Sequence, residues 1–348
     1  MRILQAAETL HTTAKAIRFY EKEGLLTPEK DITNGYRNFN EKNLLRLSTI
    51  LALREIDVPV ADIKKLLEND DMDMNQYLNI QRSALFERWL AIKDMIQTID
   101  QMVKRTEGKD FQMQDIHELA KQLKHIKTKR TEWQDRWNFN DQADDYDDNI
   151  KMQGYRFNVH QDYDKALQMV TDYVQMKTND TCLDIGIGTG NLGAKFLQKG
   201  VHVIGVDQAE NMLEACKQKH PEIEVRKGHF LALPVLDQQV NAVVSSYALH
   251  HLPDAEKLLA FVEMDRVLKT GGQICIADLM FENGRHRKKV LEAFQEAGNE
   301  LAVDAIEDEY YADRSILEDW LTKHRYHVAA ITINDILSVI HAVKQPAL

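Results

Sequence analysis

The chain has 348 residues, 44% apolar and 28% charged, so its length and composition predict a globular protein of two or three domains. A formal net charge of −11 excludes a uniformly basic nucleic-acid-binding surface, so any contact with DNA has to come from a local patch. No apolar segment approaches the ~18 residues of a membrane span, and the first residues lack a secretion signal, which predicts a cytoplasmic protein.

Short helices joined by tight turns are predicted for the first 70 residues. Thr12 or Thr13 can cap a helix that carries Ile17 and Tyr20 on its apolar side. Gly24 ends this helix, because glycine readily adopts the backbone conformation that follows a last helical turn.

A small wing follows this helix. Asn34-Gly35 predicts a tight hairpin that presents Tyr36 and Arg37. The stretch IRFYEKEGLLTPEKDITNGYR resembles the signature of the MerR family of winged helix-turn-helix regulators, and the resemblance covers residues 1–70. It implies a dimer that grips promoter DNA at a palindromic operator and distorts it.

The resemblance also implies which residues contact DNA, with Lys15 added from its position alone. They are Lys15, Arg18, Tyr20, Tyr36 and Arg37. Asp57 stands where the family usually has glycine, and Lys30 where it usually has arginine. We expect a moderate DNA affinity that depends steeply on salt. A DNA-binding fold retained only for dimerisation is the alternative.

Residues 71–108 predict one long helix. Its apolar positions step by four and three alternately, with Arg82 the one polar member of the series Leu78, Arg82, Leu85, Trp89, Ile92, Ile96, Ile99 and Val103. This spacing is typical of a coiled coil and predicts a homodimer through residues 75–105. A connecting helix is expected within 109–137, and the acidic stretch 138–149 is interpreted as a linker into the last domain, 138–348.

In that last domain, helices alternate with short apolar strands, which predicts a mostly parallel sheet with helices on both faces. The expected strands are residues 181–186, 201–206, 222–226, 240–246, 272–277, 327–333 and 336–342. Only Asn334-Asp335 joins the last two, which predicts a hairpin and one antiparallel strand at the end of the sheet.

The stretch LDIGIGTGNLG follows the first of these strands and admits two interpretations. If a dinucleotide fingerprint begins at Gly188, Asp184 lies inside a buried strand, where an unpaired carboxylate is costly. If the turn opens at Gly186, Asp184 lies at the carboxyl edge and can face a cationic ligand. Asp207 ends the next strand and suits a ribose diol in either case.

Five successive motifs resemble those of class I S-adenosylmethionine-dependent methyltransferases over roughly residues 135–348. They are LDIGIGTGNLG, VIGVDQAENMLEAC, GHFLALP, SSYALHHLPDAEK and RVLKTGGQICIAD. The resemblance implies a Rossmann-like seven-stranded α/β sheet, S-adenosylmethionine as the cofactor, and cofactor contacts from Tyr146, Asp184, Gly186, Gly188, Gly190, Asp207, Met212, His229 and Phe230. His229 stands where the family often has an acidic residue facing the adenine.

The methyl acceptor is expected beyond the fourth strand of the sheet. Tyr247 and His250 are the predicted catalytic residues there, whereas His251 is expected to start a helix. Asp278 either faces the pocket or caps a helix. A polar cluster either covers the acceptor or forms a half-exposed helix face: Glu309, Tyr310, Tyr311 and Arg314. The Asn/Asp-Pro-Pro-Tyr/Phe motif of base-methylating enzymes is missing, which favours a small-molecule acceptor.

The cysteines disfavour a thiolate metal sensor. Cys182, Cys216 and Cys275 form no C-x-x-C pair and none precedes residue 182, so we expect reduced buried thiols and no metal site. The sequence thus predicts a dimeric DNA-binding regulator with a methyltransferase domain that acts on a small molecule. Two alternatives stay open: a non-catalytic regulator whose effector is S-adenosylmethionine or S-adenosylhomocysteine, and an enzyme whose front end only dimerises.

Overall fold

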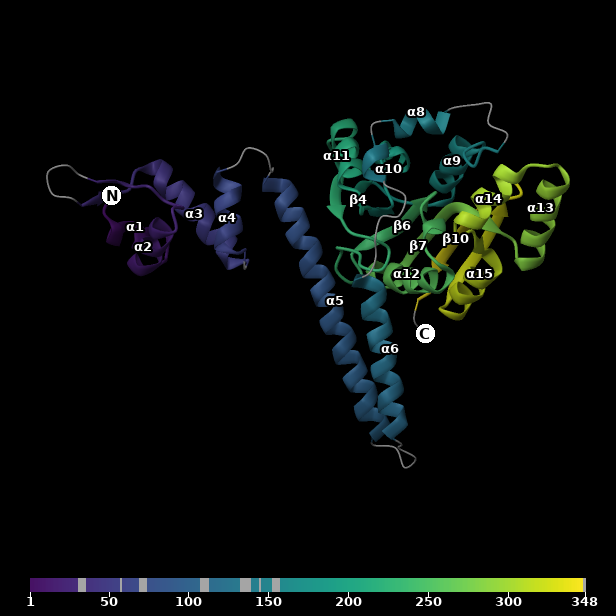
Figure 1. Ribbon diagram of the computed structural model, residues 1–348, viewed down its shortest axis with the longest axis horizontal. Coiled ribbons are helices and arrows are strands. Elements are labelled where there is room, and N and C mark those ends of the chain that lie inside the picture. Colours follow the sequence, from purple (N-terminus) through teal and green to yellow (C-terminus); the bar gives the residue numbers. More distant parts are fainter. Residues whose placement is uncertain are drawn as a thin grey trace. The chain divides into compact units, whose positions relative to one another are not determined.

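The computed structural model describes residues 1–30, 36–56, 58–68, 74–106, 113–131, 139–143, 145–151 and 157–346. The chain forms two compact units, Met1–Gln81 and Arg82–Leu348, and the boundary between them falls inside one long helix (Figure 1). Within the described residues, no helix combines the length and the apolar character that crossing a membrane requires.

In the described residues of the first unit, four helices and two strands precede the start of α5 (Met74–Thr106). Its elements are α1 (Ile3–Thr9), α2 (Ala14–Lys22), β1 (Glu29–Lys30), β2 (Arg37–Asn38), α3 (Glu41–Glu55) and α4 (Val60–Glu68), and β1 and β2 pair antiparallel. Thr13 caps α2 by accepting a hydrogen bond from the amide of Ala16 at 3.1 Å. The predicted turn at Asn34-Gly35 and the departure at Asp57 lie outside the described residues.

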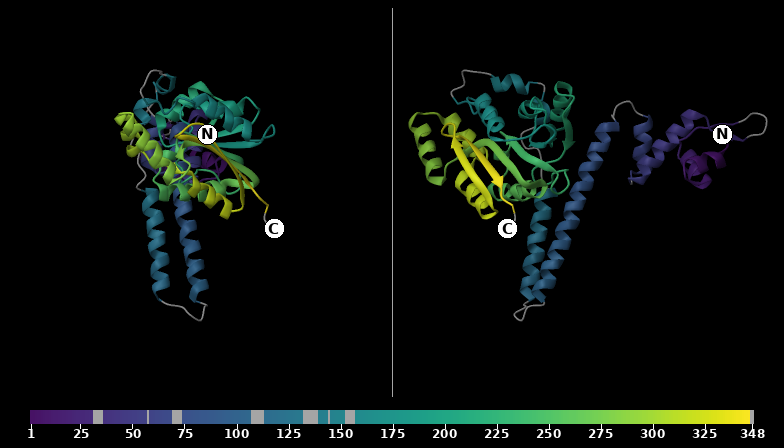
Figure 2. Two further views of the ribbon diagram at one scale, coloured as in Figure 1. Left: turned by 90° about the vertical axis from the view of Figure 1, so that its right-hand side faces the viewer. Right: turned by 180° about the vertical axis from the view of Figure 1, so that it is seen from behind.

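Two helices connect this unit to the last domain. The long helix predicted over 71–108 is α5 (Met74–Thr106), and the connecting helix is α6 (Met113–Thr131). Figures 1 and 2 show α5 and α6 running antiparallel, side by side. The acidic stretch 138–149 is not the linker that its composition suggested, because its described residues form α7 (Phe139–Gln142) and the start of α8 (Tyr146–Lys151).

A twisted, mostly parallel sheet forms the centre of the second unit. Its strands are β3 (Thr181–Ile185), β4 (His202–Asp207), β5 (Glu224–Lys227), β6 (Val240–Ser246), β7 (Leu268–Phe281), β9 (Tyr326–Thr332) and β10 (Leu337–Lys344). They lie in the order β5-β4-β3-β6-β7-β10-β9. The predicted antiparallel strand is β10, but it lies between β7 and β9 rather than at the edge. The two-residue strand β8 (Ala312–Asp313), which we did not predict, pairs with the end of β7.

Helices cover both faces of this sheet. The helices are α9 (Tyr163–Tyr173), α10 (Asn191–Leu197), α11 (Glu210–Lys219), α12 (Asp254–Val267), α13 (Gly284–Glu296), α14 (Glu300–Asp308) and α15 (Arg314–Lys323), with the short turn η1 (Leu249–His251) after β6. Residues of α9, α10 and α11 pack in the core on one face, and residues of α12 and α15 in the core on the other. The three cysteines are buried free thiols, as predicted.

Candidate functional site

The candidate site lies where the parallel strands end. Strand β3 is followed by Gly186, Gly188 and Gly190, whose φ angles are +71°, +52° and +92°. Only glycine adopts such angles freely, so the chain can turn sharply here. At Gly186 space also requires glycine, because a Cβ atom would lie 2.4 Å from the Cβ of Ala248.

Asp207 ends β4 beside this turn. Its Oδ2 accepts a hydrogen bond from the amide of Gly188, and its Oδ1 accepts one from the amide of Ala209, both at 2.9 Å. The two amides fix the orientation of the carboxylate, and each oxygen keeps further acceptor capacity. A fixed carboxylate at the end of the second strand of such a sheet can accept hydrogen bonds from two vicinal hydroxyl groups.

A cavity of about 60 Å³ opens beside Asp207. It is lined by Phe139, Tyr146, Ile185, Gly186, Gly188, Val206, Asp207, Gln208, Met212, Gly228, His229, Phe230, Tyr247, Ala248 and His251. We call it the nucleoside cavity. Seven of the nine predicted cofactor residues line it, and Asp184 and Gly190 do not.

Asp184 corrects the prediction that it faces the ligand. Its side chain is 1% exposed and lies beneath the glycine turn, with Oδ2 only 3.3 Å from the place where Gly193 would carry a Cβ. Burial raises the pKa of this carboxyl well above its usual range. Asp184 therefore lies buried beneath the turn and does not line the nucleoside cavity.

Helix α8 closes one side of the nucleoside cavity and is tied to the body of the domain by Asp147. This carboxylate accepts hydrogen bonds from the Thr189 hydroxyl at 2.7 Å, the Asn191 amide at 2.8 Å and the Lys219 ammonium at 2.6 Å. Burial opposes its ionisation, but these three donors lower the pKa of Asp147 overall. The contact holds Tyr146 in place over the glycine turn.

Tyr247 follows β6 in a strained backbone conformation, with φ of +50°. Its side chain is 5% exposed, and its hydroxyl has no hydrogen-bond partner among the described residues. Burial raises the pKa of this phenol. Strain in a non-glycine residue and an unpaired buried hydroxyl are costs that a structural role does not explain.

His250 lies in η1 and is held by Asp278 at the end of β7. The distance from His250 Nδ1 to Asp278 Oδ1 is 2.5 Å, and the amides of Ala248 and Leu249 donate to Oδ2 of the same carboxylate. On its other side, His250 Nε2 lies 3.8 Å from Oε2 of Glu309. Burial disfavours a charged imidazole, but the Asp278 carboxylate raises the pKa of His250 overall.

A second, larger cavity of about 470 Å³ adjoins the first, and we call it the acceptor chamber. It is lined by Phe139, Gln142, Tyr146, Asn149, Phe157, Asn158, Val159, His160, Tyr247, His250, His251, Leu279, Ala305, Asp308 and Glu309. Phe139, Tyr146, Tyr247 and His251 line both cavities. The predicted catalytic pair, Tyr247 and His250, therefore lines the chamber, and Tyr247 also reaches the nucleoside cavity.

Sequence reasoning missed several of these residues. The sequence left open whether Asp278 faces the pocket or caps a helix. Its contact with His250 joins residues 28 positions apart, and no local sequence pattern indicates such a pair. Phe139 was part of the supposed linker, and His251 was expected to be structural, although it lines both cavities. For Glu309, the sequence left open whether its side chain covers the acceptor or lies on a half-exposed helix face. It lines the acceptor chamber.

In the first unit, the predicted DNA contacts fall into two groups. Lys15 and Arg18 are exposed on α2, and Tyr36 is 60% exposed on the wing, where Arg37 pairs with Glu21 at 2.5 Å. Tyr20 differs, because its ring packs in the core of the unit and is 8% exposed. Its burial corrects the prediction of a DNA contact there.

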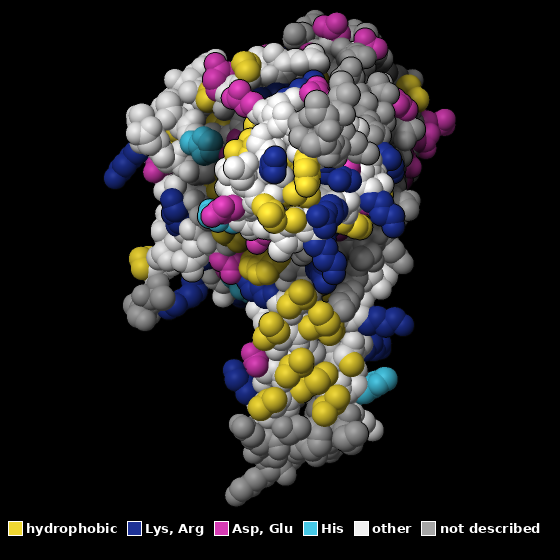
Figure 3. Space-filling view, turned by 90° about the vertical axis from the view of Figure 1, so that its left-hand side faces the viewer, with side chains coloured by type: hydrophobic (Ala, Val, Ile, Leu, Met, Phe, Trp, Pro, Cys, Tyr) yellow, Lys and Arg dark blue, Asp and Glu magenta, His cyan; other side chains and the backbone are white. Residues whose placement is uncertain are grey.

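Helix α5 uses the residues of the predicted coiled-coil seam in two ways. Five of them are at least 43% exposed and form an apolar stripe: Leu85, Ile92, Ile96, Ile99 and Val103. Figure 3 shows hydrophobic side chains gathered along the long helices, in the lower part of the view. Arg82 and Trp89 instead contact the α/β part of the same unit. Arg82 pairs with Glu224 in β5 at 3.2 Å, and the Arg266 guanidinium lies 5.1 Å from the Trp89 ring centre.

Comparison with known proteins agrees with both halves of this description. Residues 1–70 match the family described as MerR HTH family regulatory protein, and residues 182–272 match the family described as methyltransferase domain. An uncharacterized methyltransferase of Oceanobacillus iheyensis is 32% identical over 207 residues, which are 59% of this chain and 95% of the relative. One from Alkaliphilus oremlandii has the same identity and coverage.

Among solved structures, magnesium protoporphyrin IX methyltransferase of Synechocystis PCC 6803 with bound SAH is similar at 16% identity. The match covers 60% of this chain and 96% of that chain, with a TM-score of 0.47. The curated relatives and the two sequence families lead to one conclusion: this chain belongs to the methyltransferases, and its residues 1–70, in front of that domain, match the MerR HTH family of regulatory proteins.

Proposed function

We propose that the protein methylates a small molecule in the acceptor chamber and, as a dimer, binds operator DNA through its first unit. The observation that carries the enzymatic part is the wall that the two cavities share. Because Tyr146, Tyr247 and His251 line both, a ligand in one cavity lies next to a ligand in the other. Methyl transfer needs such an arrangement, since donor and acceptor atoms must approach in line and without water between them.

The residues of the nucleoside cavity fit S-adenosylmethionine. Asp207 would accept hydrogen bonds from the ribose hydroxyls, and the absent side chains at Gly186 and Gly188 allow close approach of the backbone. Met212 and Phe230 would supply apolar walls for the adenine, with His229 at the same wall. When bound, the cofactor supplies an electrophilic methyl group on a positively charged sulfur.

Access to this cavity requires movement of α7 and α8. A volume of about 60 Å³ is far below the roughly 300 Å³ at which sites for drug-sized ligands begin. Phe139 and Tyr146 come from α7 and α8 and are the lining residues that precede the sheet in the chain. We therefore assign these helices the role of a cover that opens for the cofactor and then excludes water.

The chamber residues would place the acceptor atom. His250 Nδ1 is engaged by Asp278, so Nε2 is the nitrogen left to accept a hydrogen bond from an acceptor O–H or N–H group. The Tyr247 hydroxyl supplies a second polar contact from the shared wall. The acceptor lone pair forms the new bond to the methyl carbon, the electrons of the carbon–sulfur bond stay on sulfur, and the acceptor proton passes to water.

The chamber also favours a small acceptor that is not an anion. Its volume of about 470 Å³ lies within the range of small-molecule sites. Among the described residues that line it there is no lysine or arginine, whereas Asp308 and Glu309 are acidic. A carboxylate or phosphate acceptor would therefore find no lysine or arginine to neutralise it in this lining and would lie near two acidic side chains.

The test uses methyl-labelled S-adenosylmethionine, the purified full chain and a cell extract separated by size. We expect label in the small-molecule fraction with the unmodified protein and, at limiting cofactor, at least about tenfold less with Asp207→Asn. Label in nucleic acid or protein fractions instead would overturn the small-molecule assignment. Bound cofactor with no transferred label in any fraction would overturn the enzymatic proposal and favour a sensor.

For the regulatory part, we propose DNA contacts from Lys15, Arg18, Tyr36 and Arg37, and a homodimer through residues 75–105. The functional division that follows is 1–70 for DNA, 71–108 for dimerisation, 109–137 as connection and 138–348 for methyl transfer. The exposed positive side chains on α2 and the wing, and the apolar stripe on α5, support it. Selection of bound sequences from a random DNA library at low salt should return a palindrome; no preferred sequence would leave dimerisation as the role of the first unit.

A second candidate function is sensing of the cofactor or its product, and the contacts of α5 favour it. Arg82 pairs with Glu224 at 3.2 Å and donates to the carbonyl of Val225 at 3.4 Å, both in β5. Strand β5 runs directly into Gly228, which lines the nucleoside cavity. Helix α5 and the wall of the nucleoside cavity are thus joined through β5.

Coupling is tested by measuring operator affinity with and without S-adenosylhomocysteine, and S-adenosylhomocysteine affinity with and without operator. Linkage requires that operator DNA and S-adenosylhomocysteine each change the affinity of the other by the same factor. We expect Arg82→Met to bring both factors close to one while each ligand still binds. If Arg82→Met kept both affinity changes, coupling through the contact of Arg82 with β5 would be wrong. If neither ligand changed the affinity of the other in the unmodified protein, the sensing function would be wrong.

A further inference from the structure

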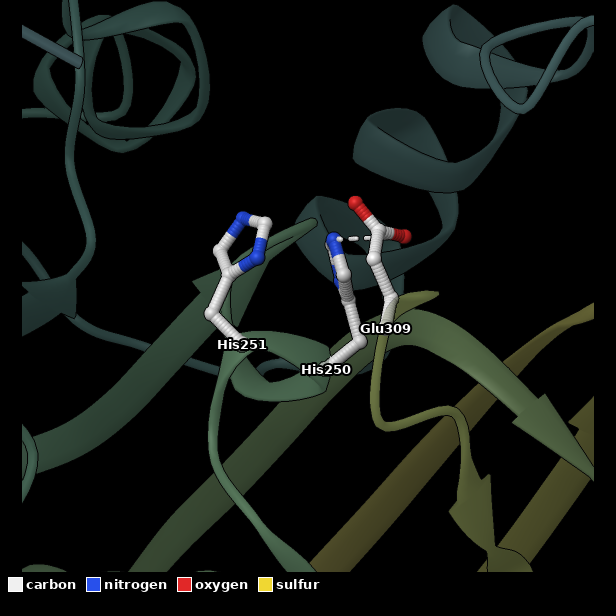
Figure 4. A group of neighbouring side chains, drawn as sticks. All are labelled: His250, His251 and Glu309. Atoms are coloured by element: carbon white, nitrogen blue, oxygen red, sulfur yellow. Dashed lines mark ion pairs between the residues drawn. The ribbon is translucent and has the colours of Figure 1, made fainter. Parts of the chain in front are cut away.

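We propose that His250, His251 and Glu309 hold a divalent transition-metal ion at the junction of the two cavities. Each residue offers one ligand atom, and these atoms lie within 4.8 Å of one another. Figure 4 shows the three side chains, two from η1 and one from the segment after α14, converging on one region. All three line the acceptor chamber, and His251 lines the nucleoside cavity as well.

His250 is prepared as a ligand by its buried partner. Asp278 lies 2.5 Å from Nδ1, so the hydrogen of a neutral ring resides on Nδ1 and the lone pair on Nε2. The amides of Ala248, Leu249 and Leu279 donate to the same carboxylate and hold it rigidly. A carboxylate that orients the far nitrogen of a histidine is the usual outer shell of a metal-bound imidazole.

Glu309 lies at the distance that two ligands of one ion require. Its Oε2 is 3.8 Å from His250 Nε2, too far for a hydrogen bond. In a tetrahedral site with bonds of about 2.1 Å, two ligand atoms lie about 3.4 Å apart. A shift of a few tenths of an ångström would let one ion bind both atoms.

His251 completes the set, since its ring centre lies 4.0 Å from that of His250. Two imidazoles and one carboxylate favour zinc, iron(II) or manganese over magnesium, which prefers oxygen ligands. Three protein ligands leave at least one coordination position open, as in catalytic rather than structural sites. The acidic Asp308, also in the chamber lining, adds favourable charge.

This inference rests on the proposed function and refines how His250 reaches the acceptor, namely through the ion. An acceptor hydroxyl bound at the open position would be held beside the wall shared with the nucleoside cavity. Coordination lowers the pKa of a bound hydroxyl, so its proton passes to water and the oxygen lone pair becomes a stronger nucleophile. The acceptor class is therefore a hydroxylated small molecule, and the reaction is O-methylation.

The site is tested on metal-free full-length protein by equilibrium dialysis with Zn²⁺ and by the visible absorption of bound Co²⁺. We expect one ion per chain. Glu309→Gln should weaken binding at least about tenfold, the loss that even an outer-shell partner causes. Glu307→Gln is the matched control, because Glu307 lies two residues earlier, in α14, pairs with Arg287 and does not line the chamber.

Binding that Glu309→Gln loses and Glu307→Gln keeps would support the site, and so would a matching loss in His251→Ala. Failure to bind either ion, or binding that is unchanged in Glu309→Gln, would overturn it. Calorimetric binding of S-adenosylhomocysteine and label transfer, measured on the same preparations, keep this result separate from the proposed function. Methyl transfer at full rate by metal-free protein would overturn the assignment of the ion to the acceptor.

Discussion

The amide of Gly188 donates to the carboxylate of Asp207 over 2.9 Å, so the turn after β3 and the end of β4 form a single rigid wall of the nucleoside cavity. The second carboxylate oxygen is held by the amide of Ala209 at the same distance. Asp207 is therefore oriented before any ligand binds, and a ligand need not spend free energy on ordering it.

Asp207→Asn should weaken the binding of S-adenosylhomocysteine by at least about tenfold, because a hydrogen bond to a charged group contributes about 1.5–3 kcal/mol. Isothermal titration calorimetry measures the change directly. Asp319→Asn, an exposed aspartate on α15 that pairs with Lys323, is the matched control. Equal affinities for both variants would contradict the assigned ribose contact.

Two buried tyrosines, Tyr247 and Tyr311, allow an effect on methyl transfer to be distinguished from an effect on stability. The hydroxyls of Tyr247 and Tyr311 both lack a hydrogen-bond partner among the described residues, but only Tyr247 lines the cavities. Removing such a hydroxyl should leave the free energy of unfolding unchanged or raise it by about 1 kcal/mol in either variant. Methyl transfer should fall about tenfold in Tyr247→Phe and stay constant in Tyr311→Phe.

Denaturant unfolding and label transfer, measured on both variants, check this pair. If Tyr311→Phe lost as much activity as Tyr247→Phe, the effect would have to be structural. The acceptor contact assigned to Tyr247 would then be wrong.

Asp147 should control how long the cofactor stays bound, because it ties α8, which carries Tyr146, to Thr189, Asn191 and Lys219. Asp147→Asn is expected to speed release of S-adenosylhomocysteine by about tenfold, the equivalent of about 1.4 kcal/mol lost from the closed state. Stopped-flow fluorescence measures the release rate. Asp148→Asn, the exposed neighbour on the same helix, should release at the unmodified rate.

The hydrogen bonds of Asp147 also predict that the rate of S-adenosylhomocysteine release depends on pH. The pKa of Asp147 is lowered in the folded protein, so the ionised contact is complete at neutral pH and is lost as pH falls through that lowered value. Release from the unmodified protein should accelerate in acid, whereas Asp147→Asn should lack that acceleration. An acid acceleration of equal size in both proteins would show that another group opens α8.

The apolar stripe of α5 should hold the dimer together. Ile96 and Ile99 are 55% and 57% exposed, and burying such side chains contributes about 1.5–3 kcal/mol each. Ile96→Lys combined with Ile99→Lys is expected to give monomers in light scattering at micromolar concentration. Gln97→Lys adds one positive charge at an exposed position between them and should stay dimeric. A dimer that survives the double change would place the interface elsewhere.

The elements that local pattern determines could be predicted from the sequence, and those that depend on distant contacts could not. Alternation of apolar strands and amphipathic helices located the seven long strands of the main sheet within a few residues, because the central strands β3, β6 and β7 are mostly buried apolar runs. The direction of Asp184 was wrong, since which face of β3 a side chain takes depends on the helix that covers it. Composition likewise misjudged residues 138–149, where Phe139 and Tyr146 are held by packing on distant residues.

The site shows the same division. Glycine spacing and the end of β4 indicated the nucleoside cavity, because the motif residues are close in the chain. The link from His250 to Asp278 and the approach of Glu309 depend on how β6, β7 and α14 are brought together. Tyr20 was predicted both to lie on the apolar side of α2 and to contact DNA. Its ring packs in the core of the first unit, so the apolar pattern was the better guide.

Helix α5 carries residues bound to the methyltransferase body, such as Trp89 and Lys93, and exposed stripe residues, such as Ile92 and Ile96, within the same two turns. Each residue added to a helix rotates everything beyond it by about 100°. A single insertion between Lys93 and Ile96 would therefore rotate the rest of the stripe by about 100° while the contacts of Trp89 and Lys93 stayed where they are. Chimaeras that join this enzyme domain to another DNA-binding module would have to keep the rotational phase of α5, adding or removing residues in steps of about seven.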